Sequence, residues 1–210
     1  MEMLSCREGR ERLHSLLRLQ SPPYVTGAYI VKTPNGMDKL AGVWHCIEQF
    51  ATVRSAWPES VGRRVSETWL SVAKDMLEAP QHWSLERAWR WLLPQDHMGP
   101  FMAYEVVSDL RHTALLDRAP DIMTWANAGP GAMRGLNRIH DRDLYYARRS
   151  HPWVEEMREL LEISRDGRHW PPVSESWPIM EMREIEHTLC EWDKYMRVAR
   201  GEGRPRGTYP

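Results

Sequence analysis

The sequence predicts a mainly α-helical protein, and three observations favour that class. Apolar residues recur at three- and four-residue steps along most of the chain, the spacing that lines one face of a helix. Proline and glycine residues fall mostly between these periodic segments. Only residues 24–33 read as a strand, closed by the turn Pro34-Asn35-Gly36, and no opposing strand is visible. We therefore expect an all-α fold with a short strand or extended arm near the N-terminus.

The first two expected helices lie before residue 81. Leu40, Trp44 and Ile47 lie on the apolar stripe of a helix over about 38–53. Pro58 opens the next helix and Pro80 ends it, because proline suits a first turn and cannot continue a helix.

The remaining helices also carry start or stop signals. Ser84 is a candidate N-cap for a short helix over about 84–93, which Pro94 stops. Another helix starts after Gly99-Pro100 and runs to about His112. Residues 125–136 are glycine-rich and lead into a basic helix. Pro152 starts a helix that ends near residue 167, and the last covers about 180–200, with irregular stretches at 113–130 and 165–179.

Length and composition favour one globular domain. The chain has 210 residues, of which 42% are hydrophobic, and it contains eleven tryptophans. A chain of this length can bury about 70% of its unfolded surface, which excludes disorder as the main description. We expect a single helical domain over residues 1–200, followed by a flexible basic tail over 201–210.

Nothing in the sequence predicts a membrane or secreted protein. No run approaches about 18 consecutive apolar residues, and residues 1–12 are too charged for a signal peptide. The three cysteines lie far apart, which argues against a disulfide framework. The prediction is a reduced, cytoplasmic protein with no membrane partner.

The charge distribution leaves two interpretations open. The net charge is −1, but residues 131–150 and 194–210 are rich in arginine and lysine. Basic segments on a neutral body are typical of a face that meets phosphate. A solvated helix face with a frayed tail explains the same pattern equally well.

Residues 84–112 form a candidate helix-hairpin-helix. The run Met98-Gly99-Pro100-Phe101 has one expected helix before it and another after it. The glycine is expected to permit a backbone shape that other residues cannot take. Free amides at the start of the second helix would then cradle an anion such as a DNA phosphate.

This hairpin resembles that of the helix-hairpin-helix DNA glycosylase superfamily over about residues 84–126. Asp121 follows Gly99 by 22 residues, about the spacing at which an essential aspartate of that superfamily faces a flipped nucleotide. The superfamily's usual Leu-Pro-Gly-x-Gly is replaced here by Asp96-His97-Met98-Gly99. Base excision is therefore the third of three functional interpretations.

Three ordered blocks resemble bacteriophage thymine-hypermodification enzymes, the α-glutamyl/putrescinyl thymine pyrophosphorylases, also described as amino acid:DNA transferases. The blocks are Gly99-Pro100-Phe101-x-Ala103-Tyr104 with Asp109-Leu110, the glycine-rich residues 125–136, and residues 184–195. The resemblance covers about residues 24–200 and extends to the helical region of 5-hydroxymethyluracil DNA kinases. It implies a DNA-glycosylase-like helical domain, encoded by a phage and working in the host cytoplasm.

The resemblance implies a substitution at an activated base in double-stranded DNA. A 5-hydroxymethyluracil DNA kinase, the functional partner, makes the pyrophosphate ester of the base. The transferase then displaces pyrophosphate with the amine of an amino acid such as glycine, glutamate or ornithine, and no further cofactor is assigned. The base must leave the stack for this reaction. The chain lacks the Gly-x-x-x-x-Gly-Lys-Ser/Thr phosphate loop, so we do not expect it to be the kinase.

The reaction and the resemblance together select candidate site residues. A buried carboxylate can support charge at the reacting carbon or deprotonate the amine, and cations can hold pyrophosphate. The catalytic candidates are Asp121, Glu186 and Glu191. The candidates for binding substrate or pyrophosphate are Lys39, Asn127, Arg134, Lys194 and Tyr195. The candidates for binding DNA are Gly99, Phe101, Gly129, Gly131 and Arg138.

Several candidates also have structural interpretations. Asp121 follows a proline and can cap a short helix. Gly129 and Gly131 can simply shape a helix start, and the two glutamates can form solvated pairs on a helix. At the level of function, the alternative is a non-catalytic helical DNA-binding module that positions a partner enzyme.

Cysteine and histidine residues carry two further hypotheses. Cys190 lies beside Leu189 on an apolar face, which favours a buried thiol over a thiolate that attacks the pyrimidine ring. His187 with Cys190, and His45 with Cys46, lack further ligands at zinc spacing, so no metal site is predicted.

Overall fold

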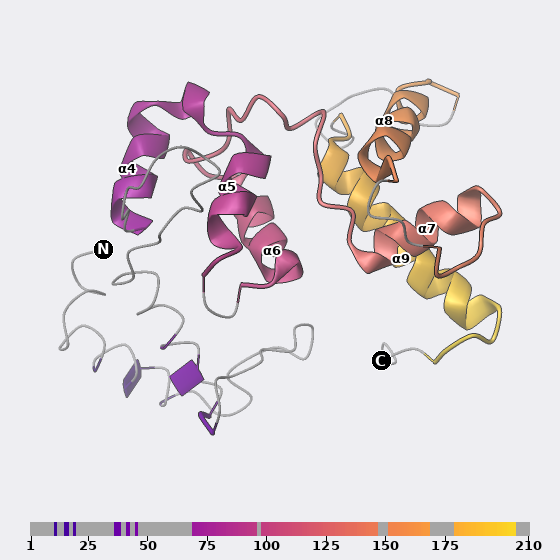
Figure 1. The fold of residues 1–210 in the computed structure, drawn as a ribbon, viewed down its shortest axis with the longest axis horizontal. Coiled ribbons are helices and arrows are strands. Elements are labelled where there is room, and N and C mark those ends of the chain that lie inside the picture. The colour runs from indigo at the N-terminus through magenta and orange to yellow at the C-terminus, as the bar shows by residue number, and fades with distance from the viewer. Residues whose placement is uncertain are drawn as a thin grey trace. The chain divides into compact units, whose positions relative to one another are not determined.

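The structure is a computed structural model that describes residues 69–95, 98–146, 151–168 and 179–204, together with a few residues before position 69. These residues form helices and no strands (Figure 1), which confirms the all-α class. The helices are α4 (Trp69–Glu78), η2 (Pro80–His82), α5 (Leu85–Leu92), α6 (Pro100–Leu110), α7 (Pro130–Ile139), α8 (Trp153–Ser164) and α9 (Met182–Ala199).

Several predictions about the N-terminal part fall outside the described residues. They are the strand or arm over 24–33, Lys39, and most of the helices expected over 38–53 and 58–80. Ala41, Gly42 and His45 are described and are helical. The side chain of Asp38 accepts a hydrogen bond from the backbone nitrogen of Ala41 at 2.9 Å, which confirms the predicted start of that helix.

The chain divides into two compact units, and each is described by itself. The first contains residues 1–78 and 91–99, and the second contains residues 79–90 and 100–210. In the first unit, α4 buries Val72, Ala73 and Met76 on one face and ends before Pro80, as predicted. The single domain over residues 1–200 stays a prediction.

The two helices expected within residues 84–112 are present as α5 and α6. Ser84 caps α5 as predicted, because its hydroxyl accepts a hydrogen bond from the backbone nitrogen of Arg87 at 3.0 Å. The special backbone conformation predicted for Gly99 is wrong, whereas its role in binding DNA stays a prediction. Its φ is not in the left-handed region, and a Cβ there would meet no atom within 4 Å. Residues with a side chain can therefore adopt the backbone conformation found at this position.

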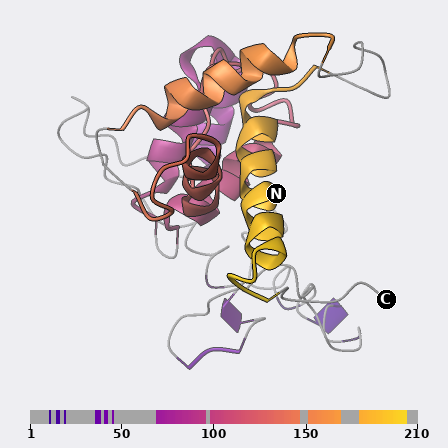
Figure 2. The same ribbon diagram turned by 90° about the vertical axis from the view of Figure 1, so that its right-hand side faces the viewer.

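The core of the second unit joins four helices. Figure 2 shows α8 lying across the N-terminal half of α9, and both pack with α7. The buried apolar side chains come from α6, the segment before α7, and α7, α8 and α9. They are Tyr104, Ala126, Ala132, Leu136, Trp153, Met157, Leu161, Met182, Ile185 and Leu189.

Glycine residues let the backbones of α7 and α9 approach closely. A Cβ at Gly135 would lie 2.6 Å from the carbonyl oxygen of Leu189, and one at Gly131 would overlap the sulfur of Cys190. Any side chain at these positions would push the helices apart. The glycine-rich start of α7 therefore has a packing role, and it sets the distance from α7 to the residues of α9.

The start of α9 is fixed by contacts with the irregular segment that follows α6. The guanidinium of Arg111 donates to both carboxylate oxygens of Glu181. Glu181 also forms a capping box with Glu184, and the backbone nitrogen of Met182 donates to the carbonyl oxygen of Ile122 at 3.3 Å. These bonds set the register of the residues that α9 presents to the site.

Candidate active site

The centre of the candidate site is the carboxylate of Glu186. It lies on α9 and faces the N-terminus of α7, where its Oε1 accepts a long hydrogen bond of 3.4 Å from the backbone nitrogen of Gly129. A helix N-terminus carries partial positive charge and unpaired amides, so it favours an anion. The anion at this helix start is thus a side chain of the protein itself.

Glu186 titrates near neutral pH. The residue is 6% exposed, and this burial raises the pKa of its carboxyl to about 7. The hydrogen bond from Gly129 and the charge of Lys194 act in the opposite direction, whereas Glu105 adds to the increase. A carboxyl of this kind can both accept and release a proton at pH 7.

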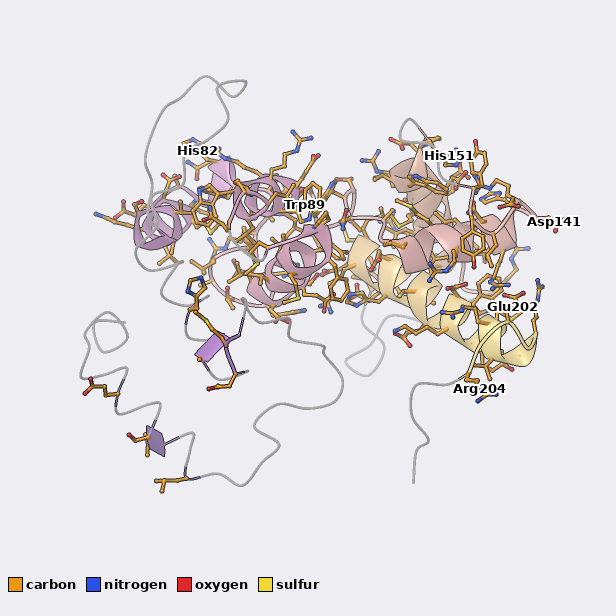
Figure 3. All side chains as sticks on the ribbon, turned by 60° about the horizontal axis from the view of Figure 1, so that its bottom comes forward. His82, Trp89, Asp141, His151, Glu202 and Arg204 are labelled. Atoms are coloured by element: carbon orange, nitrogen blue, oxygen red, sulfur yellow. The ribbon has the colours of Figure 1, made fainter. Side chains whose placement is uncertain are left out.

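A series of aromatic contacts begins at Tyr104, which Glu186 influences electrostatically and whose ring meets that of His187. The rings of Tyr104 and Trp125 are 5.9 Å apart with an edge-to-face geometry, and those of Trp89 and Trp125 are 5.8 Å apart. The indole nitrogen of Trp89 donates to the carbonyl oxygen of Pro100 at 3.0 Å, and the Asn127 side chain lies 3.5 Å from the same oxygen. Figure 3 labels Trp89 on α5. We call Trp89, Tyr104, Trp125 and His187 the aromatic cluster.

The hydroxyl of Tyr104 is a buried polar group that faces the same region. Neither this hydroxyl nor that of Ser108 makes a hydrogen bond of normal geometry among the described residues, although the Ser108 hydroxyl is close enough to lower the pKa of Tyr104. Burial raises the pKa of Tyr104 far above its usual range, and the charge of Glu186 acts in the same direction. Tyr104 therefore stays a neutral hydroxyl that can donate a hydrogen bond.

Asp121 lies at the N-terminus of α5. Its two carboxylate oxygens accept hydrogen bonds from the backbone nitrogens of Leu85 at 2.7 Å and Glu86 at 3.0 Å. Asp121 and Ser84 together satisfy the first amides of this helix. The structure thus gives Asp121 a capping role for a helix that is remote in sequence, and its catalytic role stays a prediction.

The arginines predicted to bind substrate or DNA form ion pairs with a buried aspartate of the protein itself. Arg134 and Arg138 on α7 contact different oxygens of Asp193 on α9, at 2.8 and 3.0 Å. Arg138 also binds Glu202, which Figure 3 labels on the segment after α9. Both side chains therefore hold α7 and α9 together, and their roles with DNA and pyrophosphate stay predictions.

The other predicted residues are distributed over the second unit and the α6 start. Glu191 and Lys194 form an exposed pair on α9, with 2.5 Å between Nζ and Oε1, and Tyr195 is also exposed. Phe101 is exposed at the start of α6, and so is Gly99 just before it. The structure brings Gly129 and Glu186 together, places Asn127 beside Pro100, and leaves Glu191 and Tyr195 on the surface.

Sequence reasoning missed Tyr104, Trp125 and Trp89 as site residues. Tyr104 and Trp125 lie inside the blocks that carry the family resemblance, which was the available signal. Trp89 lies on the apolar stripe of α5, which favours a core role first and a base-stacking role second. By contrast, Trp91 lies off that stripe in sequence and is buried in the structure.

Two further findings concern the described residues alone. They contain no group of three or more histidine, cysteine, aspartate or glutamate side chains arranged to hold a metal ion. No helix among them is long and apolar enough to cross a membrane.

The fold and the site define a small all-α domain with a buried carboxylate beside an aromatic cluster. Residues 11–204 match the family described as 5-hmdU DNA kinase, helical domain. This match covers most of the chain, so the protein belongs to that family. No curated protein and no solved structure matches the chain.

Proposed function

We propose that the protein is a transferase that acts on modified thymine in DNA. It replaces the pyrophosphate of 5-(pyrophosphoryloxymethyl)uracil with the amine of an amino acid. The C–O bond to pyrophosphate breaks and a C–N bond forms at the same methylene carbon. The amine loses one proton in this step, so the reaction needs a base close to the carbon.

The observation that carries the proposal is the buried carboxylate of Glu186. Its pKa of about 7 lets it accept the proton of the amine at neutral pH, and its negative charge stabilises positive charge at the reacting carbon. Asp121, a half-buried candidate, already accepts two backbone hydrogen bonds from α5. We therefore assign the base to Glu186.

The surroundings of Glu186 support a pyrimidine substrate. An extruded base is commonly held by stacking on aromatic side chains, and the half-buried Trp125 lies here against the buried ring of Tyr104. The family name refers to 5-hydroxymethyldeoxyuridine in DNA, the precursor of the proposed substrate. Among the described cations, Lys194 is more exposed than Arg134 or Arg138 and acts on the pKa of Glu186. Lys194 is thus our candidate for binding pyrophosphate.

The proposal is tested with duplex DNA that contains 5-hydroxymethyluracil. A DNA kinase and ATP make the pyrophosphate ester, the protein and a panel of amino acids are added, and nucleosides are analysed by mass. We expect one amino acid to appear on the base. Glu186→Gln should lower the rate by about 100-fold or more, in line with loss of a general base. Glu159→Gln, which removes an exposed carboxylate on α8, is the matched control.

A second candidate function is a non-catalytic DNA-binding module. The observation in its favour is that the match is to the helical domain of a kinase rather than to a complete enzyme. Such a module binds DNA and brings a partner enzyme to it, so the amino-acid product would not depend on Glu186. DNA binding without transfer by any amino acid would favour this second function.

A further inference from the structure

The side chain of the proposed base Glu186 is buried. Its side chain is 8% exposed, so a proton accepted from the amine has no direct way to solvent. The base must lose that proton before the next turnover. A neighbouring group that reaches both Glu186 and the surface would provide a route.

His187 lies between Glu186 and the surface. Its Nε2 lies 3.8 Å from Oε2 of Glu186, and its side chain is 39% exposed. The other carboxylate oxygen, Oε1, faces the backbone nitrogen of Gly129. One oxygen is therefore held by α7, and the oxygen that faces His187 is left to carry the proton. A separation of 3.8 Å allows proton transfer through one water molecule or after a small side-chain rotation.

We propose that His187 relays the proton from Glu186 to solvent during amine transfer. This inference rests on the proposed function. The amine gives its proton to the Glu186 carboxylate as the C–N bond forms. The Glu186 carboxyl then passes the proton to Nε2 of His187, and the imidazolium releases a proton to water. Both side chains return to their starting states, and no bond to carbon is involved in the relay.

Burial and a nearby arginine keep the imidazole of His187 in its neutral form. Burial lowers the pKa of His187, and the charge of Arg183 acts in the same direction. Glu105 on α6, together with Glu184 and Glu191 on α9, opposes this decrease. The imidazole is thus neutral at neutral pH, so Nε2 is unprotonated when the Glu186 carboxyl carries the proton, and the imidazolium releases its proton readily to water.

The ring of His187 is also oriented by packing. The buried ring of Tyr104 meets it edge-to-face, with centroids 6.3 Å apart. This contact comes from α6, whereas His187 and Glu186 are neighbours on α9. The ring is therefore held between two helices, which limits the positions that Nε2 can take.

The test uses the full chain, DNA that already carries the pyrophosphate ester, and the amino acid that the wild-type protein transfers. We expect His187→Gln to lower kcat by about tenfold to a hundredfold, within the range of general acid–base effects, and to leave KM for DNA nearly unchanged. Added imidazole should restore much of the lost rate, which a purely structural role would not allow. His82→Gln, an exposed histidine on η2, is the matched control and should behave as wild type with or without imidazole.

The outcomes separate the relay from the proposed function. An unchanged kcat in a folded His187→Gln protein, or a lower kcat without rescue by imidazole, would overturn the relay. Glu186→Gln would still be inactive in that case if the proposed function holds. Full activity of Glu186→Gln would instead remove Glu186 as the base, and the absence of transfer by the wild-type protein with every amino acid would remove the proposed function itself. If His187→Gln does not fold, the smaller His187→Asn is measured in the same way, with the same expected loss and rescue.

Discussion

Arg138 on α7 and Asp193 on α9 form an ion pair that water does not reach. Nε and Oδ1 are 3.0 Å apart, and the two side chains are 3% and 0% exposed. Arg134 binds the second carboxylate oxygen of Asp193 at 2.8 Å. The sequence of α7 is basic and favours contact with phosphate. In the structure, two arginines of this helix instead bind a carboxylate of the same protein.

Removing this carboxylate should destabilise the fold. Asp193→Asn leaves two guanidinium groups without their shared counter-charge, and loss of one partner from a buried ion pair costs about 3–5 kcal/mol. Urea denaturation followed by circular dichroism measures the effect. Glu162→Gln, which breaks an exposed pair with Arg165, is the control and should change stability by less than about 1 kcal/mol. Equal stability of the two variants would contradict a structural role for Asp193.

Stability should depend on pH through Glu186. Its pKa is about 7 in the folded protein against a usual value of 4.5. Between these values the folded state holds a proton that the unfolded state has lost, so stability falls as pH rises through that window. The difference corresponds to about 3 kcal/mol. Glutamine does not ionise, so Glu186→Gln keeps its stability as pH rises. Its melting temperature should exceed that of wild type at pH 8 and match it near pH 4.5. A constant difference at both pH values would show that the folded pKa is not raised.

The N-terminus of α5 should depend on two caps. Asp121→Ala and Ser84→Ala each remove acceptors for amides of this helix and should lower the free energy of unfolding by about 1–2 kcal/mol. Asp121→Asn keeps one acceptor oxygen and should lower it less. Asp117→Ala, at an exposed position in the same irregular segment, is the control. A catalytic role for Asp121 further requires that folded Asp121→Asn loses transfer by orders of magnitude.

Two glycine-to-alanine changes should have opposite effects. In Gly135→Ala the new methyl group would meet the backbone of α9, and such overpacking costs about 1–3 kcal/mol even though alanine favours helix formation. Gly99→Ala meets no atom within 4 Å and should be neutral or slightly stabilising. Thermal unfolding of both variants checks the difference. A destabilised Gly99→Ala would restore the conformational role predicted from the sequence.

Cys190 should be dispensable for transfer. Burial raises the pKa of its thiol, Lys194 opposes that effect, and Glu186 and Glu191 add to it, so the thiolate is disfavoured. Cys190→Ala should therefore retain most of the transfer activity and lose about 1 kcal/mol of stability from thinner packing against Gly131. Complete loss of transfer by a folded, DNA-binding variant would favour covalent catalysis by the thiol.

Local signals predicted the helices well. Helix ends in the structure coincide with Ser84, Pro80, Pro100 and Pro152, because caps and prolines act within one turn. The irregular stretch before α7 followed from its lack of apolar periodicity. These features depend only on neighbouring residues, which a single sequence contains.

Long-range contacts were beyond the reach of the sequence. Asp121 binds amides 36 and 35 residues earlier, and Arg138 binds a carboxylate 55 residues later. Spacing along the chain carries no information about such pairs. For this reason Asp121 and Arg138 were predicted as functional residues although the structure shows structural contacts for both. The ring contact between Tyr104 and Trp125 could not be predicted from any sequence pattern.

The pair formed by Trp89 and Trp125 also gives the candidate site its own optical signature. The two indole rings lie 5.8 Å apart and are inclined by 54°, so their electronic transitions couple in a chiral arrangement. Near-ultraviolet circular dichroism, which reports fixed tertiary packing of aromatic rings, is sensitive to such a pair. The difference spectrum between wild type and Trp125→Phe isolates this signal. A nucleobase that stacks on Trp125 can then be followed without attaching a dye to the protein or to the DNA.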